Sequence, residues 1–238
     1  MRRLLVLLVL ALGSAGLARA ADYAELQVIG FFAGGAVFAF EEYGMQDGSG
    51  FPYSNIYVID TATDSWLPGT PIRVMGTEED TVEEMRSAAL LAATPILTPY
   101  GEPEQGRTVV SNPLTELSAD PHHAEFRTRF YMAPGVPGHS LDITVFPLPA
   151  AEFCPLDFGY DYVGFELVLT LDTGETRILN HDTRIPSNRR CPTGYEIAEV
   201  IAYEQPGEMV LAILIDLLQL GFEGEDRRYL ALTTRIAE

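Results

Sequence analysis

Apolar and polar residues alternate over short stretches along most of the chain, and Gly, Pro and Asp separate these stretches. A period of two is typical of a strand with one buried face. Residues 26–42 carry Gly34 and Gly35 at their centre, which predicts a tight hairpin. Further strands are expected at residues 56–60, 107–111, 124–132, 140–146, 162–171, 177–181, 195–203, 209–217 and 228–235.

One segment, residues 77–93, shows helical spacing instead. Thr77 is a residue type that caps helices, and three acidic residues follow it, where they favour the helix dipole. Apolar residues then recur every three or four positions from Val82 to Ala93. Pro95 is predicted to stop the helix, and the apolar stripe is predicted to pack on a sheet.

Many short strands and one helix predict a mainly β fold of antiparallel sheets, sandwich or propeller-like, with an α+β fold as the alternative. The length of 238 residues suits one large domain, so residues 21–238 are expected to form a single β-rich unit. The proline-containing stretch 95–106 is the one plausible boundary inside it.

The first 20 residues have the order of a secretory signal. Met1–Arg3 is positively charged, Leu4–Leu12 is apolar, and Ala18–Ala20 ends the segment with an A-x-A cleavage pattern. An uncleaved anchor is the alternative, but nine apolar residues span less than half of the ~30 Å hydrocarbon core. The apolar stretch 209–222 is also shorter than the ~20 residues that a span needs and is interpreted as a buried strand. We therefore expect a soluble periplasmic or secreted protein without a membrane span in its mature part.

The charge of the chain narrows the classes of partner. All 15 basic residues are Arg, against 34 acidic residues, and the formal net charge is −19. Without the predicted signal, 12 Arg remain and the charge becomes −22. Such an acidic chain disfavours nucleic acid and anionic membrane surfaces as partners.

The only two cysteines, Cys154 and Cys191, are expected to form a disulfide, because an even count in an exported protein favours a bridge. Each precedes a proline, which predicts that the bridge joins two loops. A redox-active pair is the alternative, but it would favour C-x-x-C spacing.

Residues 27–66 resemble one blade of the TolB-type β-propeller family, on the strings FFAGGAVFAF and NIYVID. A closer resemblance covers most of the mature chain. The strings FAFEEYGMQDGSGFPYSNIYVIDT and GFEGEDRRYLALT, with the two Cys-Pro pairs, resemble a bacterial family of predicted secreted proteins, domain of unknown function 2259. This resemblance implies export and supplies no catalytic residues.

Several short motifs fail as catalytic or metal sites on their spacing. Ser140 stands in a string similar to the G-x-S-x-G elbow, but a strand follows it where the elbow needs a helix. Neighbouring strand residues point to opposite faces, so Glu41 and Glu42 cannot flank one bond, and His122 and His123 rarely bind one zinc ion; exposed loop histidines are favoured over a zinc site.

No catalytic residue, metal ligand or resident cofactor is therefore assigned. Calcium remains possible at two acidic glycine loops, Gln46–Gly50 and Glu223–Asp226, although neither has the spacing of a calcium loop. The arginine pairs 189–190 and 227–228 are expected to form ion pairs with nearby acids.

The loops 44–54 and 221–228 are the predicted contact surface, because they place acids, Gly and aromatic residues side by side. The chain is interpreted as a non-catalytic binding or scaffold module for an envelope or extracellular protein or ligand. A hydrolase with dispersed catalytic residues is the alternative. The residues expected to make the contact are Tyr43, Asp47, Phe51, Tyr53, Phe222, Glu223 and Asp226.

Overall fold

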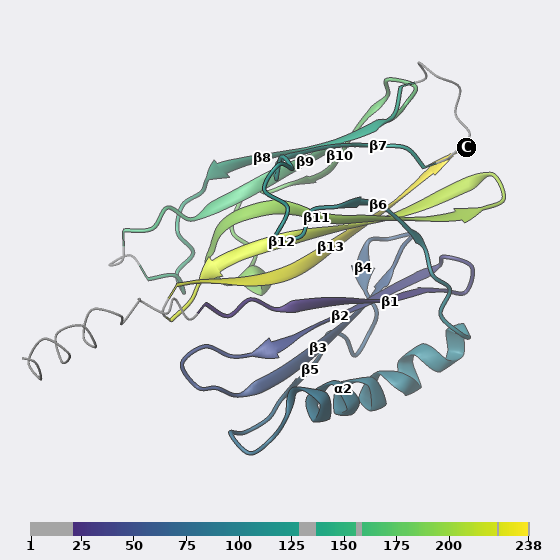
Figure 1. Ribbon diagram of the computed structural model, residues 1–238. Coiled ribbons are helices and arrows are strands. Elements are labelled where there is room, and N and C mark those ends of the chain that lie inside the picture. The colour runs from purple at the N-terminus through teal and green to yellow at the C-terminus, as the bar shows by residue number, and fades with distance from the viewer. Residues whose placement is uncertain (1–20, 129–136, 156–158, 223, 238) are drawn as a thin grey trace, which may run out of the picture.

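The computed structural model describes residues 21–128, 137–155, 159–222 and 224–237, and shows three antiparallel sheets and a helix stacked as layers (Figure 1). The predicted signal, residues 1–20, lies outside the described residues, as do Glu223 and residues 129–132 of a predicted strand. Within the described part, the helix is neither long nor apolar enough to cross a membrane.

Each sheet is formed by strands that are consecutive in the sequence, except that one earlier strand joins the central sheet. The N-terminal sheet contains β1 (Glu25–Phe32), β2 (Val37–Met45), β3 (Pro52–Asp60), β4 (Ser65–Trp66) and β5 (Ile72–Met75). The outer sheet contains β7 (His123–Phe126), β8 (His139–Pro147), β9 (Val163–Thr170) and β10 (Thr176–His181). The central sheet combines the last strands, β11 (Pro192–Gln205), β12 (Glu208–Leu220) and β13 (Glu225–Ala237), with the earlier β6 (Arg107–Ser111).

The central strand β12 explains why the sheets stack. Met209, Leu211, Ile213, Ile215 and Leu217 pack into the core shared with the outer sheet. The residues between them, Val210, Ala212 and Leu214, pack into the core shared with the N-terminal sheet. Because successive residues of a strand point to opposite faces, a nearly continuous apolar run is what a strand buried on both faces requires.

The predicted fold class is confirmed as mainly β, with antiparallel sheets, one α-helix and one disulfide in the described residues. The propeller-like alternative is wrong for this part of the chain, since the sheets are layered face to face and are not blades around an axis. The hairpin at 26–42 is present as β1 and β2.

The helix begins later than the sequence predicted and runs past Pro95. α2 spans Val82–Leu97, followed by the short 3₁₀ turn η1 (Thr98–Tyr100). The cap is Thr81, whose hydroxyl accepts from the Glu84 N–H while the Glu84 carboxylate accepts from the Thr81 N–H. Ala89, Ala93 and Leu97, at intervals of four, pack against the N-terminal sheet.

Thr77 is not the helix cap, because it closes a separate turn. Its N–H and hydroxyl both donate to Asp80 Oδ2, at 2.7 and 2.9 Å. The chain therefore contains two consecutive Thr-x-x-acid motifs, and the second one starts the helix. That start places the small side chains of Ala89 and Ala93 against β3, where a helix can approach closely.

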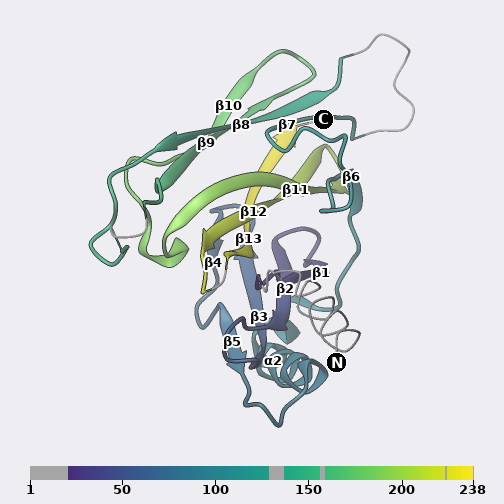
Figure 2. The ribbon, with the colours of Figure 1, turned by 60° about the vertical axis from the view of Figure 1, so that its left-hand side comes forward.

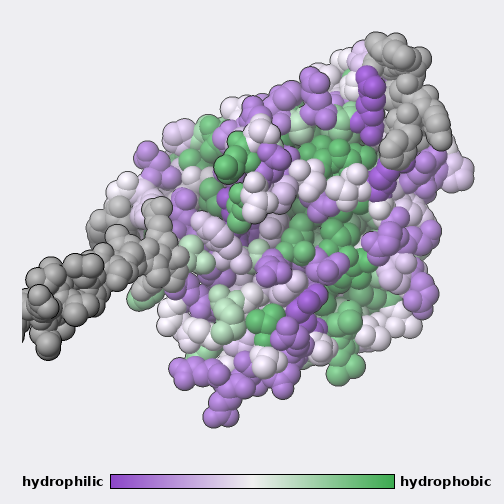
Figure 3. Space-filling model, in the orientation of Figure 1, coloured by the Kyte–Doolittle hydropathy of each residue, from purple (hydrophilic) through white to green (hydrophobic). Residues whose placement is uncertain are grey.

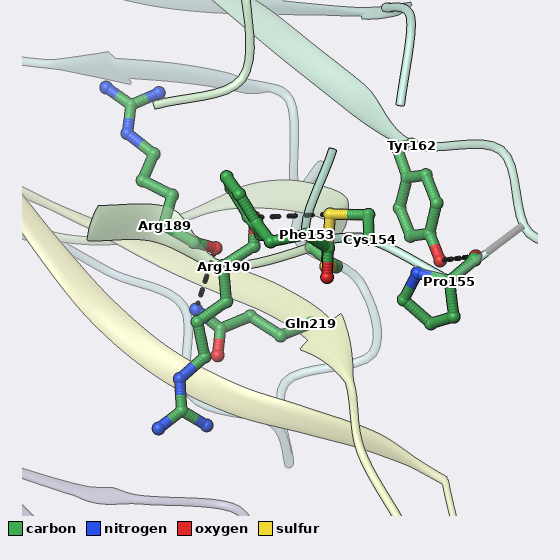
Figure 4. The surroundings of a disulfide bond; sticks show 8 residues. Phe153, Cys154, Pro155, Tyr162, Arg189, Arg190 and Gln219 are labelled. Carbon is green, nitrogen blue, oxygen red and sulfur yellow. Dashed lines mark hydrogen bonds between the residues drawn. A yellow bond between two sulfur atoms is a disulfide. The ribbon is translucent and has the colours of Figure 1, made fainter. Parts of the chain in front are cut away.

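The disulfide Cys154–Cys191 confirms the predicted bridge between two loops (Figure 4). Its Cα atoms are 5.5 Å apart, and both cysteines are buried with Tyr162 and Ile185. The bridge closes a separation of 37 residues, for which the chain-entropy model gives a stabilisation of about 4 kcal/mol. It fixes the segment that leads from the short 3₁₀ turn η2 (Ser187–Arg189) into β11.

Candidate functional site

A cleft of about 510 Å³ lies where strands β3 to β5 of the N-terminal sheet face β10, the η2 segment and β13. Strands β4 and β5 occupy one edge of their sheet, and β13 is the edge strand of the central sheet (Figure 2). β10 is the edge strand of the outer sheet, so the cleft is built where edges of all three sheets meet, and its volume is within the range of small-molecule sites.

A row of polar side chains crosses one wall of the cleft. Glu42 of β2 pairs with Asn55 of β3, and Asn55 pairs with Arg73 of β5, so the three residues lie side by side on one face. The Asn55 amide donates to Glu42 Oε1 at 2.9 Å. Glu42 Oε1 also accepts from the Tyr57 hydroxyl at 2.8 Å, and Oε2 accepts from the Tyr229 N–H at 2.8 Å. The Glu42 carboxylate, 2% exposed, is thus held by three donors.

Aromatic side chains form the next part of the same wall. Tyr57 stacks on Phe40 with ring centroids 4.7 Å apart and contacts Trp66 with centroids 5.9 Å apart. Burial and the adjacent Glu42 carboxylate hold the pKa of Tyr57 well above its usual value, so this residue is a neutral hydrogen-bond donor. Trp66 keeps 39% of its surface exposed. The cleft therefore offers a flat apolar surface at this end.

Tyr53 lines the other end of the cleft but is not a surface residue. It is only 3% exposed, which corrects its placement on the predicted contact surface. Its hydroxyl donates to Asp22 Oδ1 at 2.8 Å, and Asp22 forms an ion pair with Arg228. The Arg228 guanidinium lies 4.9 Å from the Tyr53 ring centroid. Tyr53 is buried because these contacts hold the segment around Asp22 against β13.

The arginine pairs behave differently from one another. Arg227 forms ion pairs with Asp216 and Glu196, and Arg228 pairs with Asp22 and Asp226, as predicted. Arg189 pairs with Asp182 at 2.7 Å. Arg190 does not follow the prediction: among the described residues, no carboxylate lies within ion-pair distance of it, and it lines the cleft.

The two predicted contact loops meet in the structure. A Cβ atom on Gly48 would lie 3.0 Å from the Phe222 ring. Phe222 is 78% exposed, whereas Phe51 and Asp47 are half-buried. Burial raises the pKa of Asp226, and the charges of Arg228 and Arg190 oppose this shift. The loops 44–54 and 221–228 thus form a continuous surface beside the Arg190 end of the cleft, with Glu223 outside the described residues.

Tyr43 is separated from that surface. Its ring lies under the Arg86 guanidinium of α2, 3.8 Å from the centroid, and its hydroxyl donates to Glu25 at 3.0 Å. Residues 41 and 43 face α2, while Glu42 faces the central sheet. The opposite orientation of Glu41 and Glu42 is as predicted, and it takes Tyr43 away from the cleft.

The candidate catalytic motifs do not assemble. Ser140 lies in β8 and its hydroxyl donates to Asp142 Oδ2 at 3.4 Å, while His123 Nδ1 contacts Asp142 Oδ1 at 2.7 Å. The carboxylate therefore stands between serine and histidine, whereas a catalytic triad needs the histidine in the middle. Within the described ranges, no three His, Cys, Asp or Glu side chains gather as potential metal ligands.

Sequence reasoning missed most of the cleft, including Asn55, Trp66, Arg73 and Tyr229. These residues come from β3, β4, β5 and β13, which the fold alone brings together. The surface around the layers is mixed, with apolar residues exposed between hydrophilic ones on the face in Figure 3. The sequence signal that could have drawn attention to the cleft is the single tryptophan of the chain.

Comparison with known proteins identifies the family and nothing narrower. Residues 39–235 match a family described as predicted secreted protein, domain of unknown function 2259. This match covers most of the chain, which therefore belongs to that family. No curated protein matches the chain.

Proposed function

We propose, on the premise of this membership in a secreted family, that the protein is an exported binding protein whose ligand occupies the cleft at the meeting edges of the three sheets. We further propose that it works in the periplasm or outside the cell after removal of residues 1–20, and that it carries out no catalysis. The single observation that carries the proposal is the character of the cleft: ligand-sized, with an aromatic surface at one end and oriented hydrogen-bonding groups at the other.

The state of the cleft carboxylates supports binding over hydrolysis. Glu42 accepts three hydrogen bonds, and Asp64 Oδ1 accepts from the N–H and hydroxyl of Thr233, at 2.6 and 3.0 Å. A general acid or base must be able to reach the substrate and exchange a proton with it. Both oxygens of Glu42 and Oδ1 of Asp64 instead accept hydrogen bonds from fixed donors of the protein, which is typical of groups that hold a wall in place.

The position of Trp66 gives a direct test, because it is the only tryptophan and lies in the cleft. A thermal-shift screen of saccharides, amino acids and organic acids on the oxidised mature protein should find compounds that raise the melting temperature. We expect the same compounds to change Trp66 emission. Trp66→Phe should remove the emission signal while the shift in melting temperature persists.

A matched control separates cleft binding from surface binding. Leu91 of α2 is 75% exposed and does not line the cleft, so Leu91→Ser should leave both signals unchanged. Stabilising compounds that never affect Trp66 emission would argue against the cleft. Turnover of esters, glycosides or peptides by the purified protein would instead overturn the non-catalytic assignment and favour the hydrolase alternative.

The joined loops 44–54 and 221–228 are proposed as a second contact surface, for a protein of the cell envelope or the surrounding medium. The exposed ring of Phe222 beside Gly48 supports this role. Capture of partners from an envelope extract should weaken for Phe222→Ala and persist for Leu117→Ala, which removes an even more exposed apolar side chain elsewhere. Identical partners for both variants would argue against this surface.

A further inference from the structure

The cleft contains two cationic side chains that the protein itself does not neutralise. Arg73 and Arg190 both line it, and among the described residues neither has a carboxylate within ion-pair distance. Most of the other described arginines are ion-paired, although Arg184, outside the cleft, has no ion pair among the described residues either. Ion pairs with Asp or Glu hold Arg86, Arg177, Arg189, Arg227, Arg228 and Arg235.

The two arginines reach the cleft from different walls. Arg73 extends from β5 beside Asn55, and its charge acts on the Tyr57 hydroxyl, where it opposes the rise in pKa caused by burial. Arg190 comes from the segment between η2 and β11. Its charge reaches Asp226 without forming an ion pair. A ligand in the cleft would therefore meet positive charge from both sides.

The backbone around Arg190 is held firmly for a surface arginine. Arg190 directly precedes Cys191, whose position the disulfide fixes. On its other side, the Gln219 side-chain amide donates a hydrogen bond to the Arg189 carbonyl at 3.1 Å (Figure 4). The φ of Arg190, 51°, lies in the left-handed region, which a non-glycine residue adopts at a cost of about 1 kcal/mol or more. The fold thus constrains the position from which this side chain enters the cleft.

The acidic side chains of the cleft do not cancel these charges. Glu42 is 2% exposed, and its carboxylate oxygens already accept three hydrogen bonds from the protein. Asp64 lies next to Ser65 of β4, at the Trp66 end, and its carboxylate is directed at Thr233. Arg73 is at the level of Asn55 along β3, whereas Trp66 is at the level of Ile59. Arg73 and Trp66 are therefore about 13 Å apart along the strand, at ~3.3 Å per residue, and Tyr57 lies between their levels.

We infer that the cleft recognises an elongated anionic ligand: a carboxylate or phosphate between Arg73 and Arg190, and a ring packed against Tyr57 and Trp66. This inference rests on the proposed function and adds to it the chemical class of the ligand. Arginine suits such groups because its planar guanidinium can donate two parallel hydrogen bonds to an oxyanion. Because an aromatic wall stands beside a cationic wall, the cleft favours a molecule that carries both an anionic group and a ring.

Two probes that differ only in charge test the inference. 8-Anilinonaphthalene-1-sulfonate carries a sulfonate in place of the natural oxyanion, and N-phenyl-1-naphthylamine has the same rings without it. On the oxidised mature protein, we expect energy transfer from Trp66 to both probes. The anionic probe should bind about tenfold or more tightly than the neutral one, and added salt should weaken only the anionic probe.

Variants assign that preference to the two arginines. Arg73→Gln and Arg190→Gln should each weaken the anionic probe by about fivefold, as expected for one partly exposed charge pair, and leave the neutral probe unchanged. Arg184→Gln is the matched control, because Arg184 is exposed, has no ion pair among the described residues and does not line this cleft. Circular dichroism should show the same strand content for all three variants.

The possible failures are distinguishable. Equal affinity for the two probes, or unchanged affinity in both cleft variants, would overturn the anionic ligand and leave a neutral-ligand cleft intact. Absence of energy transfer from Trp66 to either probe would count against the cleft itself, and so against the proposed function as well.

Discussion

The two faces of the central sheet are packed in different ways. Toward the outer sheet lies the aliphatic interface, in which Phe and Tyr make up three of the twenty buried residues that the structure describes there. Toward the N-terminal sheet lies the aromatic interface, in which they make up four of ten. The aromatic interface also has Glu42 and Asp216 at its margin, both buried. The same sheet therefore supports a dry core on one side and a partly polar one on the other.

This difference in packing shows where a binding site can form in a stack of sheets. Branched aliphatic side chains interdigitate and leave little space, so the aliphatic interface gives stability. Aromatic rings are larger and carry polar edges, and the buried Glu42 and Tyr57 need hydrogen-bond partners at the margin. The cleft opens at that margin, and Leu217 and Leu232 at the edge of the aliphatic interface also line it. We interpret the aliphatic interface mainly as structural support and the polar margin of the aromatic interface as the part that supplies the binding groups.

The largest effects should come from removing one core side chain from each interface. Phe40→Ala in the aromatic interface should lower the free energy of unfolding by about 3 to 5 kcal/mol, and Ile213→Ala in the aliphatic one by about 2 to 5 kcal/mol. Only Phe40→Ala should also change Trp66 emission, because Phe40 stacks on Tyr57 and Tyr57 contacts Trp66. Denaturant unfolding and fluorescence measure the two effects. Equal changes in emission would remove the distinction between the interfaces.

A smaller effect should follow from changing the buried acceptor of the aromatic interface. Glu42→Gln replaces one acceptor oxygen by a donor and leaves the Tyr229 N–H, or the Tyr57 and Asn55 donors, without a partner. We expect a loss of about 2 kcal/mol, since an unsatisfied buried polar group costs 1 to 3 kcal/mol. Urea unfolding at neutral pH measures this loss. A variant as stable as the natural protein would show that the polar margin is not structural.

The pH dependence of stability should identify Asp216, the buried acid on the same face. Burial raises its pKa to about 6, against the favourable charge of Arg227. A carboxylate whose pKa is raised on folding destabilises the folded state above that pKa, and this cost disappears as the pH falls. Between pH 7 and pH 5 the group should therefore add about 1 kcal/mol of stability.

The Asp216→Asn variant should not show this rise in stability between pH 7 and pH 5, although the other titratable groups are unchanged in it. The comparison is between the two proteins, each measured by denaturant unfolding at pH 7 and pH 5. An identical change with pH in both would show that Asp216 does not titrate in this range.

The smallest effect should come from the outer face of the N-terminal sheet. Arg86 of α2 contacts Glu41 through two nitrogens, but one third of its side chain is exposed. In a double-mutant cycle with Glu41→Gln and Arg86→Gln, the coupling energy should be below about 1 kcal/mol. A coupling as large as the loss for Glu42→Gln would mean that both faces of the sheet depend on buried charge.

Much of the fold could be predicted because local patterns dictate it. The β1–β2 hairpin follows from Gly34 and Gly35, and β12 follows from an apolar run too short for a membrane span. The start of the helix could not be placed, because Thr77 and Thr81 offer the same capping chemistry four residues apart. Packing of Ala89 and Ala93 on the sheet decides between them, and packing is not a local property.

The site could be predicted only in part. The composition of the loops 44–54 and 221–228 predicts a contact surface, which stays a prediction, and the structure brings Gly48 and Phe222 of these loops together. The burial of Tyr53 could not be foreseen, because it depends on Asp22 and Arg228, which are distant in sequence. The cleft combines side chains from segments more than 100 residues apart in the chain, such as Arg73 and Arg190. No local sequence motif indicates which distant residues the fold brings together.

The order of the strands has a consequence for the passage of a secreted chain through a membrane. Three of the four central strands, β11 to β13, come from the last part of the sequence. A chain that is threaded N-terminus first exposes β1 to β5 and then β7 to β10 before the sheet between them exists. The face of each partial sheet that packs on the central sheet has no cover until then, so complete folding of a chain exported as proposed waits for the C-terminal strands. The topology thus leaves these two apolar faces exposed until the last strands have emerged.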